Sequence, residues 1–131
     1  MSVAYFCIGL LALLLFVLGL HVSLTRGRTK INYGAEQDPQ SALYKANRAH
    51  GNTAEYAPLL ALMMFILAQS PQAEWVMWTM VGATFFRYLF VAGILLPQTM
   101  DKPNAMRFFG SLGTYLCGGT LAVLILLQAM S

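Results

Sequence analysis

The sequence predicts an all-α membrane protein, built as a four-transmembrane-helix bundle. Two observations support this fold class. Of the 131 residues, 58% are apolar and only 10% are charged, whereas soluble domains carry about 25% charged residues. The apolar residues also gather in segments separated by polar or proline-containing connections. The net charge of +3 does not indicate a nucleic-acid-binding protein, because the basic residues flank or interrupt apolar runs and form no single soluble face.

A single domain, residues 1–131, accounts for the whole chain, with helices expected at about 3–25, 39–69, 73–96 and 104–130. Residues 3–24 contain no formal charge and are long enough to cross a hydrocarbon core of about 30 Å. Basic residues follow this run and no cleavage motif ends it, which favours a retained helix over a signal peptide. Asp38-Pro39 and Ser70-Pro71 predict caps followed by a proline in the first turn, and Pro103 is expected to open the last helix.

Basic residues predict the orientation in the membrane. They gather at the first and third connections: Arg26, Arg28, Lys30 and Lys45 at the first, Lys102 and Arg107 at the third. The second connection has none. Because basic loops stay on the cytoplasmic side, we expect these two connections in the cytoplasm and both termini on the opposite side.

The segment at 39–69 differs from the others because it carries ionisable side chains. Only residues 56–68 are cleanly apolar, which is too short to cross a membrane alone. At about 100° per residue, five side chains fall within roughly 100° of arc: Lys45, Arg48, Asn52, Glu55 and Tyr56. His50 falls on the opposite side, which indicates a helix-packing histidine. Ionisable groups within a bilayer face the bundle interior, where they pair or serve function. The stripe is therefore a structural ion-pair network or a ligand site, and we favour the ligand site.

Depth along the predicted helices brings particular charges to the same level. Glu55 and Arg87 lie about 22 and 21 Å from the second connection, so they are able to pair; the alternative role for Arg87 is ligand contact. Arg48 lies about 33 Å from the second connection, and Arg107 lies about 35 Å from Met130 at the end of the last predicted helix. Both arginines are therefore expected near the cytoplasmic surface. Two arginines repel unless an anion lies between them, which predicts a ligand with carboxylates arriving from the cytoplasm. The alternative for Arg107 is snorkelling to the interface.

Small residues recur every four positions in the last predicted helix: Gly110, Thr114, Gly118 and Ala122. Such a ladder lets another helix approach closely, from the same chain or from a second one. Because four helices enclose little interior, a charged site is more easily hidden between subunits, and we expect a homo-oligomer. Cys7 and Cys117 lie inside apolar runs without CxxC or metal-ligand spacing, so no metal site is predicted.

Residues 48–58, R-A-H-G-N-T-A-E-Y-A-P, resemble the R-A-x-x-N-x-x-E-Y-x-P segment of the membrane-associated proteins in eicosanoid and glutathione metabolism, the MAPEG family. That family includes microsomal glutathione transferases, leukotriene and prostaglandin synthases and many bacterial members. The resemblance extends over essentially the whole chain, and the R-A-H-G-N form is similar to the bacterial branch. It implies a trimer of four-helix subunits in a bacterial inner membrane, with periplasmic termini and with glutathione as co-substrate at the subunit interfaces.

The resemblance also implies roles for particular residues. Four stripe residues would contact glutathione, with the carboxylate of Glu55 at its amino group: Arg48, Asn52, Glu55 and Tyr56. Arg26 and Tyr88 match further family positions that serve the same site, and Arg107 resembles the arginine that activates the thiol in the synthases. The synthases carry a second tyrosine four residues after the first, where this chain has Ala92. The spacing from Tyr88 to Arg107 differs as well, so the binding positions match more fully than the catalytic ones.

The function implied is that of a glutathione-dependent transferase or peroxidase, whose hydrophobic electrophiles reach the site from the surrounding lipid. The alternative is a non-catalytic member that binds a lipid or a partner protein. Such members tend to lose polar contacts of the glutathione site, most of which this chain keeps. A small multidrug exporter also has four short spans and a buried glutamate. Its glutamate lies in the first helix, where this chain has no acidic residue.

Overall fold

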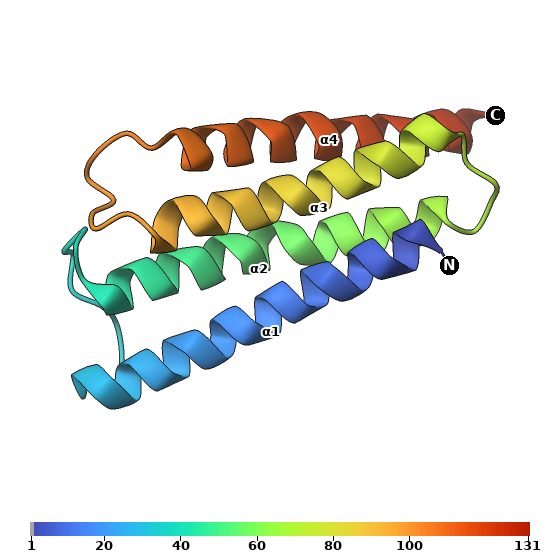
Figure 1. The fold of residues 1–131 in the computed structure, drawn as a ribbon. Helices are drawn as coiled ribbons and strands as arrows, with labels where there is room; N and C mark the ends of the chain where they lie inside the picture. The colour runs from blue at the N-terminus through green and yellow to red at the C-terminus, as the bar shows by residue number, and fades with distance from the viewer. Residues whose placement is uncertain (1) are drawn as a thin grey trace.

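The computed structural model describes residues 2–131, which form four α-helices and no strand. The helices are α1 (Val3–Thr29), α2 (Ala42–Leu67), α3 (Glu74–Leu95) and α4 (Ala105–Met130). Each runs antiparallel to its neighbour in the chain, as Figure 1 shows. The two termini and the α2–α3 connection lie at one end, and the other two connections lie at the opposite end. The predicted all-α, four-helix fold class is thereby confirmed.

Two helix ends differ from the predicted positions near the first connection. α1 continues past 25 to Thr29, where Lys30 takes a left-handed conformation and donates its backbone N–H to the carbonyl of Arg26. The predicted cap at Asp38 is wrong. The hydroxyl of Ser41 caps α2 instead, while the carboxylate of Asp38 accepts from the backbone N–H of Gln40 in the preceding turn. Asp38 and Pro39 therefore belong to a turn before the helix.

The starts of α3 and α4 also differ in their capping residues. The predicted cap at Ser70 is wrong, because α3 begins after Ala73 with no side-chain cap. The hydroxyl of Ser70 instead accepts a hydrogen bond from the amide of Gln72. At α4 the side chain of Asn104 is the cap, so Pro103 stands just outside the helix that it was expected to open.

Within residues 2–131, three helices are long and apolar enough to cross a membrane: α1, α3 and α4. α2 is not, because its first half carries the polar stripe. α2 nevertheless runs beside the others for a comparable length (Figure 1). Large apolar side chains cover much of the outer surface, including Phe16 and Trp78, which are 76% and 65% exposed. Such exposure suits a molecule whose surroundings are lipid.

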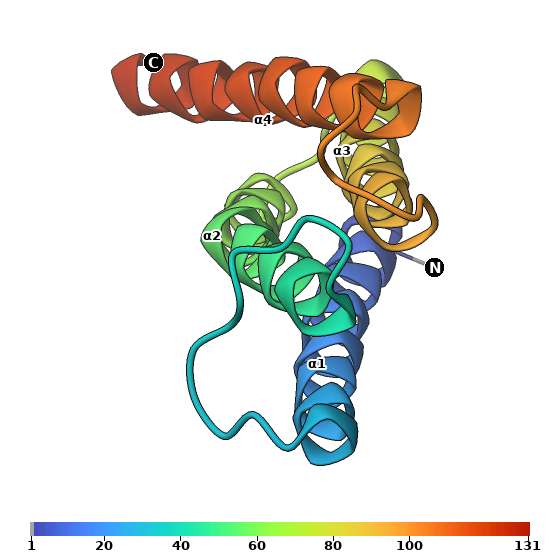
Figure 2. The same cartoon turned by 90° about the vertical axis from the view of Figure 1, so that its left-hand side faces the viewer.

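α4 packs closely on α3, and two of its own glycines lie at this contact. A Cβ added to Gly110 would lie 2.6 Å from the Cα of Phe90, and one added to Gly113 would meet the ring of Phe86. Further along the helix, Gly118 faces Leu60 of α2 instead. Figure 2 shows the reason, since α4 crosses α3 obliquely and extends over α2. Part of the small-residue ladder therefore serves contacts within one chain.

Candidate functional site

The polar stripe lies on α2 and faces out of the single protomer. The side chains of Arg48 and Glu55 are exposed, and those of Asn52 and Tyr56 are half-buried. Among residues 2–131, no ion pair engages Arg48 or Glu55. The sequence predicted that the stripe would be hidden, and within one protomer it is not. No other part of the described chain covers these two charged groups.

Behind the stripe lies a buried arginine from α3. Arg87 is 1% exposed, and its Nη2 donates to Oδ1 of Asn52. Its guanidinium carbon stands 5.1 Å from the ring centroid of Tyr56 and 4.9 Å from that of Phe90, within the range of a cation–π contact. The sequence put Arg87 at the depth of Glu55, and the structure puts it beside Asn52, which lies one helical turn from Glu55. The expected ion pair with Glu55 does not form, because the amide of Asn52 is the partner.

Arg26 lies in the last turn of α1, where it organises the connection to α2. Its Nη1 donates to the carbonyls of Ile31 and Gly34, at 3.2 and 2.9 Å, and its Nη2 donates to Oδ1 of Asn47 at 3.4 Å. Asn47 was not singled out from the sequence, because it falls outside the arc of the stripe and belongs to no motif. The guanidinium of Arg26 is thus engaged by backbone and by α2, close to where the stripe begins.

Tyr88 lies away from the stripe, on the side of α3 that faces α1. Its hydroxyl donates to the carbonyl of Leu10 at 2.8 Å. The side chain lines an apolar groove of about 320 Å³ between the two helices, together with Cys7 and Phe85. No hydrogen bond among the described residues joins Tyr88 to the stripe. The family-based assignment of Tyr88 to the same site is therefore not realised within one protomer.

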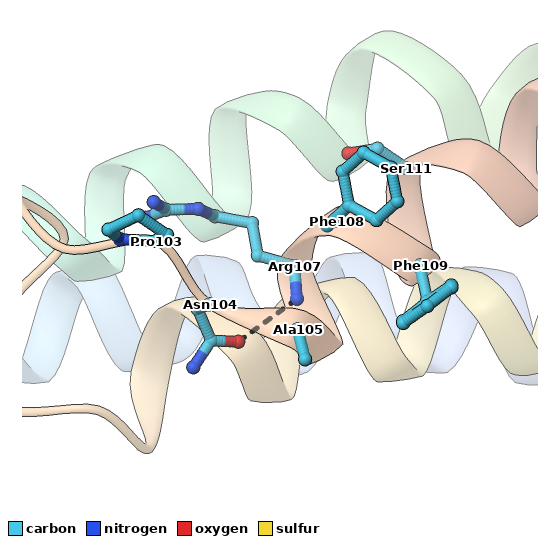
Figure 3. Close-up of a pocket in the computed structure, with 7 residues that line it drawn as sticks. All are labelled: Pro103, Asn104, Ala105, Arg107, Phe108, Phe109 and Ser111. Atoms are coloured by element: carbon cyan, nitrogen blue, oxygen red, sulfur yellow. Dashed lines mark hydrogen bonds between the residues drawn. The ribbon is translucent and has the colours of Figure 1, made fainter.

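Arg107 stands in the first turn of α4, beside the connection from α3. Its Nη1 and Nη2 donate to the carbonyls of Met100 and Lys102, both at 3.1 Å. Figure 3 shows the side chain extending back toward Pro103, at the edge of a cavity of about 560 Å³. The anion expected between Arg48 and Arg107 stays a prediction.

Two other polar residues of α2 bind other parts of the same chain. Lys45, predicted on the stripe, donates from Nζ to the carbonyl of Pro97 at 3.0 Å and so ties α2 to the end of α3. His50 packs against Gly19 of α1, where an added Cβ would lie 3.4 Å from its Nε2. That is the helix-packing position, off the stripe, that the helical period predicts.

An apolar groove begins where the stripe ends. It measures about 280 Å³ and lies between α2 and α4, with Tyr56, Met63, Thr114 and Gly118 among its lining residues. The ring of Tyr56 lies 5.8 Å from that of Tyr115, centroid to centroid, across this groove. Tyr56 therefore joins two environments, a charged one toward Arg48 and an apolar one toward Met63.

The comparisons with known proteins gave one finding. A family model described as the MAPEG family matches residues 4–127. The searches of curated proteins and of solved structures found no match. The matched range includes the stripe, Tyr88 and Arg107, and it extends through almost all of the four helices.

Proposed function

The chain belongs to the MAPEG family, and from that premise we propose that it is a glutathione-dependent transferase or peroxidase acting on hydrophobic electrophiles. It is an integral membrane protein. We further propose that it sits in a bacterial inner membrane with periplasmic termini. Three copies assemble, and glutathione binds as co-substrate between neighbouring subunits.

The observation that carries this proposal is the outward-facing stripe of α2. Ionised side chains facing hydrocarbon cost about 2.5–3.5 kcal/mol each at the bilayer centre and less toward the membrane surface. Arg48 and Glu55 are exposed on a helix whose next turns bear the exposed apolar residues Leu59 and Leu62. Glutathione supplies the complementary groups, carboxylates for Arg48 and an ammonium for Glu55. A second protomer would cover the ligand and exclude lipid from it.

The separation of the remaining candidate residues supports a site shared between subunits. Within one chain Tyr88 faces α1 and Arg107 binds the α3–α4 connection, while the stripe faces outward. A neighbouring protomer brings its own copies of Tyr88 and Arg107 to the stripe. Arg107 keeps further N–H donors beyond the two that bind Met100 and Lys102, because a guanidinium carries five.

The proposed chemistry needs a thiolate and an adjacent apolar substrate. A thiol with a pKa of about 8.5 is mostly protonated at neutral pH, and a nearby guanidinium stabilises its thiolate. Arg107 has this role. The thiolate sulfur forms a bond to an electrophilic carbon, whose leaving group departs with the electron pair. With a hydroperoxide, the sulfur attacks oxygen and releases an alcohol, and a second glutathione then yields the disulfide and water. The groove beyond Tyr56 gives the apolar substrate a place beside the stripe.

Calorimetry of the detergent-purified protein with glutathione tests the proposal. Wild type is expected to bind, and Arg48→Ala and Glu55→Gln are each expected to lose about tenfold or more in affinity, the value of a charge-assisted hydrogen bond. Arg28→Ala and Glu36→Gln are matched controls, because both residues are exposed near the first connection and off the stripe. The controls should bind as wild type does.

Two results would count against this function. A flat titration of the wild-type protein would favour the non-catalytic alternative, which binds lipid or a partner protein. Equal losses in the stripe variants and in their controls would show that net charge, and not the stripe, governs binding. Native mass spectrometry from the same detergent tests the trimer separately, because a monomer that still binds glutathione would remove the shared site.

A further inference from the structure

Arg87 presents an unusual combination of burial and charge. It is 1% exposed, and no ion pair within residues 2–131 neutralises it. Its Nε has no hydrogen-bond partner in the same residues. Removing a guanidinium from water is expensive, and a well-packed apolar side chain in its place is often neutral or stabilising. Stability alone therefore gives little reason for an arginine here, and its hydrogen bond to α2 is the other interaction to consider.

The partner on α2 is Asn52, and the chemistry of the pair allows only one orientation of the amide. A guanidinium has donors and no acceptor, so it binds the oxygen of an asparagine and never its NH2 group. Nη2 of Arg87 accordingly donates to Oδ1 of Asn52. The Nδ2 of Asn52 remains as the group that the half-buried amide can offer to the stripe side.

Two aromatic rings hold the guanidinium in place. The rings of Tyr56 and Phe90 lie 5.1 and 4.9 Å from its central carbon. Tyr56 comes from α2 and Phe90 from α3, so the cation is held by both helices. The arginine is thereby fixed from behind the stripe, and the donor face of Asn52 is fixed with it.

We propose that Arg87 is a positioning residue that sets Asn52 to donate from Nδ2 to an oxygen of the bound peptide, a carboxylate or a peptide carbonyl. Arg87 itself does not touch the ligand. This inference rests on the proposed function, because it assumes that glutathione occupies the stripe. In this proposal Asn52 recognises an acceptor oxygen of the ligand. Arg87 fixes the orientation of the Asn52 amide, so that its NH2 group is the one that faces the ligand.

The test measures glutathione affinity and thermal stability together. Arg87→Met removes the donor but fills a similar volume, so the melting temperature should stay or rise while the dissociation constant for glutathione increases about five- to tenfold, the equivalent of one net hydrogen bond. Arg87→Lys keeps a donor-only partner for Asn52 and should restore most of the affinity. Thr84→Val is the control, because Thr84 is a buried polar residue of the same helix that bonds only within it.

Steady-state kinetics separate positioning from a structural role. Arg87→Met should raise the KM for glutathione about five- to tenfold and leave kcat at saturation unchanged, because a lost ground-state contact is uniform binding. Asn52→Asp should lose affinity about tenfold or more although it still accepts from Arg87, because a carboxylate offers no donor to the ligand.

The outcomes separate this inference from the function on which it rests. Wild-type protein that fails to bind glutathione overturns the proposed function. Wild-type binding with an unchanged dissociation constant in a stable Arg87→Met variant overturns only the role of Arg87. Should Arg87→Met fail to fold, the glutathione affinity of Asn52→Asp tests the inference instead. Full affinity in that variant would show that Nδ2 of Asn52 does not donate to the ligand, which overturns the inference.

Discussion

Gly110 offers the sharpest test of how α4 is held in the protein. A Cβ at this position would lie 2.5 Å from the backbone nitrogen of Phe90 and 2.6 Å from its Cα. Ordinary contacts begin near 3.4 Å. Because the obstacle is backbone, no side-chain rotation relieves it, and Gly110→Ala forces the two helices apart by roughly 1 Å. A gap of that size removes a quarter to a half of each contact along the interface.

The magnitude follows from overpacking and helix propensity. Inserting a methyl group into a tightly packed contact costs about 1–3 kcal/mol, and the backbone obstacle places this case at the upper end. Alanine returns at most about 1 kcal/mol through its higher helix propensity. We expect a net loss of about 2 kcal/mol in the free energy of unfolding. Phe90 also stacks on Arg87, so glutathione affinity should fall as well.

The assay is unfolding by SDS titration in mixed micelles, followed by circular dichroism. Gly9→Ala is the control, because Gly9 is an exposed helical glycine whose added Cβ meets nothing within 4 Å. It should be neutral or slightly stabilised. The reasoning is refuted if Gly110→Ala and Gly9→Ala unfold at the same SDS fraction, because the close approach of α3 and α4 would then carry no energy.

Two further predictions concern the residues that lie off the stripe. Arg107→Ala should lower the turnover number for conjugation of a generic electrophile about tenfold or more, while glutathione still binds; unchanged turnover would remove Arg107 from the mechanism. Tyr88→Phe loses the hydrogen bond to the carbonyl of Leu10 and should destabilise the protein by about 0.5–1.5 kcal/mol in the same SDS assay. A Tyr88→Phe variant with undiminished stability would show that this hydroxyl does not hold α1 against α3.

Several features of the fold and site could be predicted because they depend on local periodicity. The lengths of the apolar runs predicted helices where α1, α3 and α4 lie, and the apolar run at 56–68 predicted the second half of α2. The helical period placed Arg48 and Glu55 on one face of α2 and His50 on another, and the structure has them there. Residues 48–58 predicted the family, which the match over residues 4–127 shows.

Partners in space could not be predicted in the same way. Counting along helices brought Arg87 to the right level but could not choose between Asn52 and Glu55, which lie one turn apart on the same face. The small-residue ladder could not say that Gly110 meets α3 while Gly118 meets α2, because that depends on the oblique path of α4 in Figure 2.

The sequence by itself determined which helices form, which of them suit a membrane, and which face of α2 is polar, because each of these follows from residues a few positions apart. Only the tertiary structure decided where the guanidinium groups point. Arg107 binds loop carbonyls, Arg26 binds loop carbonyls and the amide of Asn47, and Arg87 binds the amide of Asn52. Those partners are set by how the connections fold back and how the helices cross, which no spacing along one helix encodes.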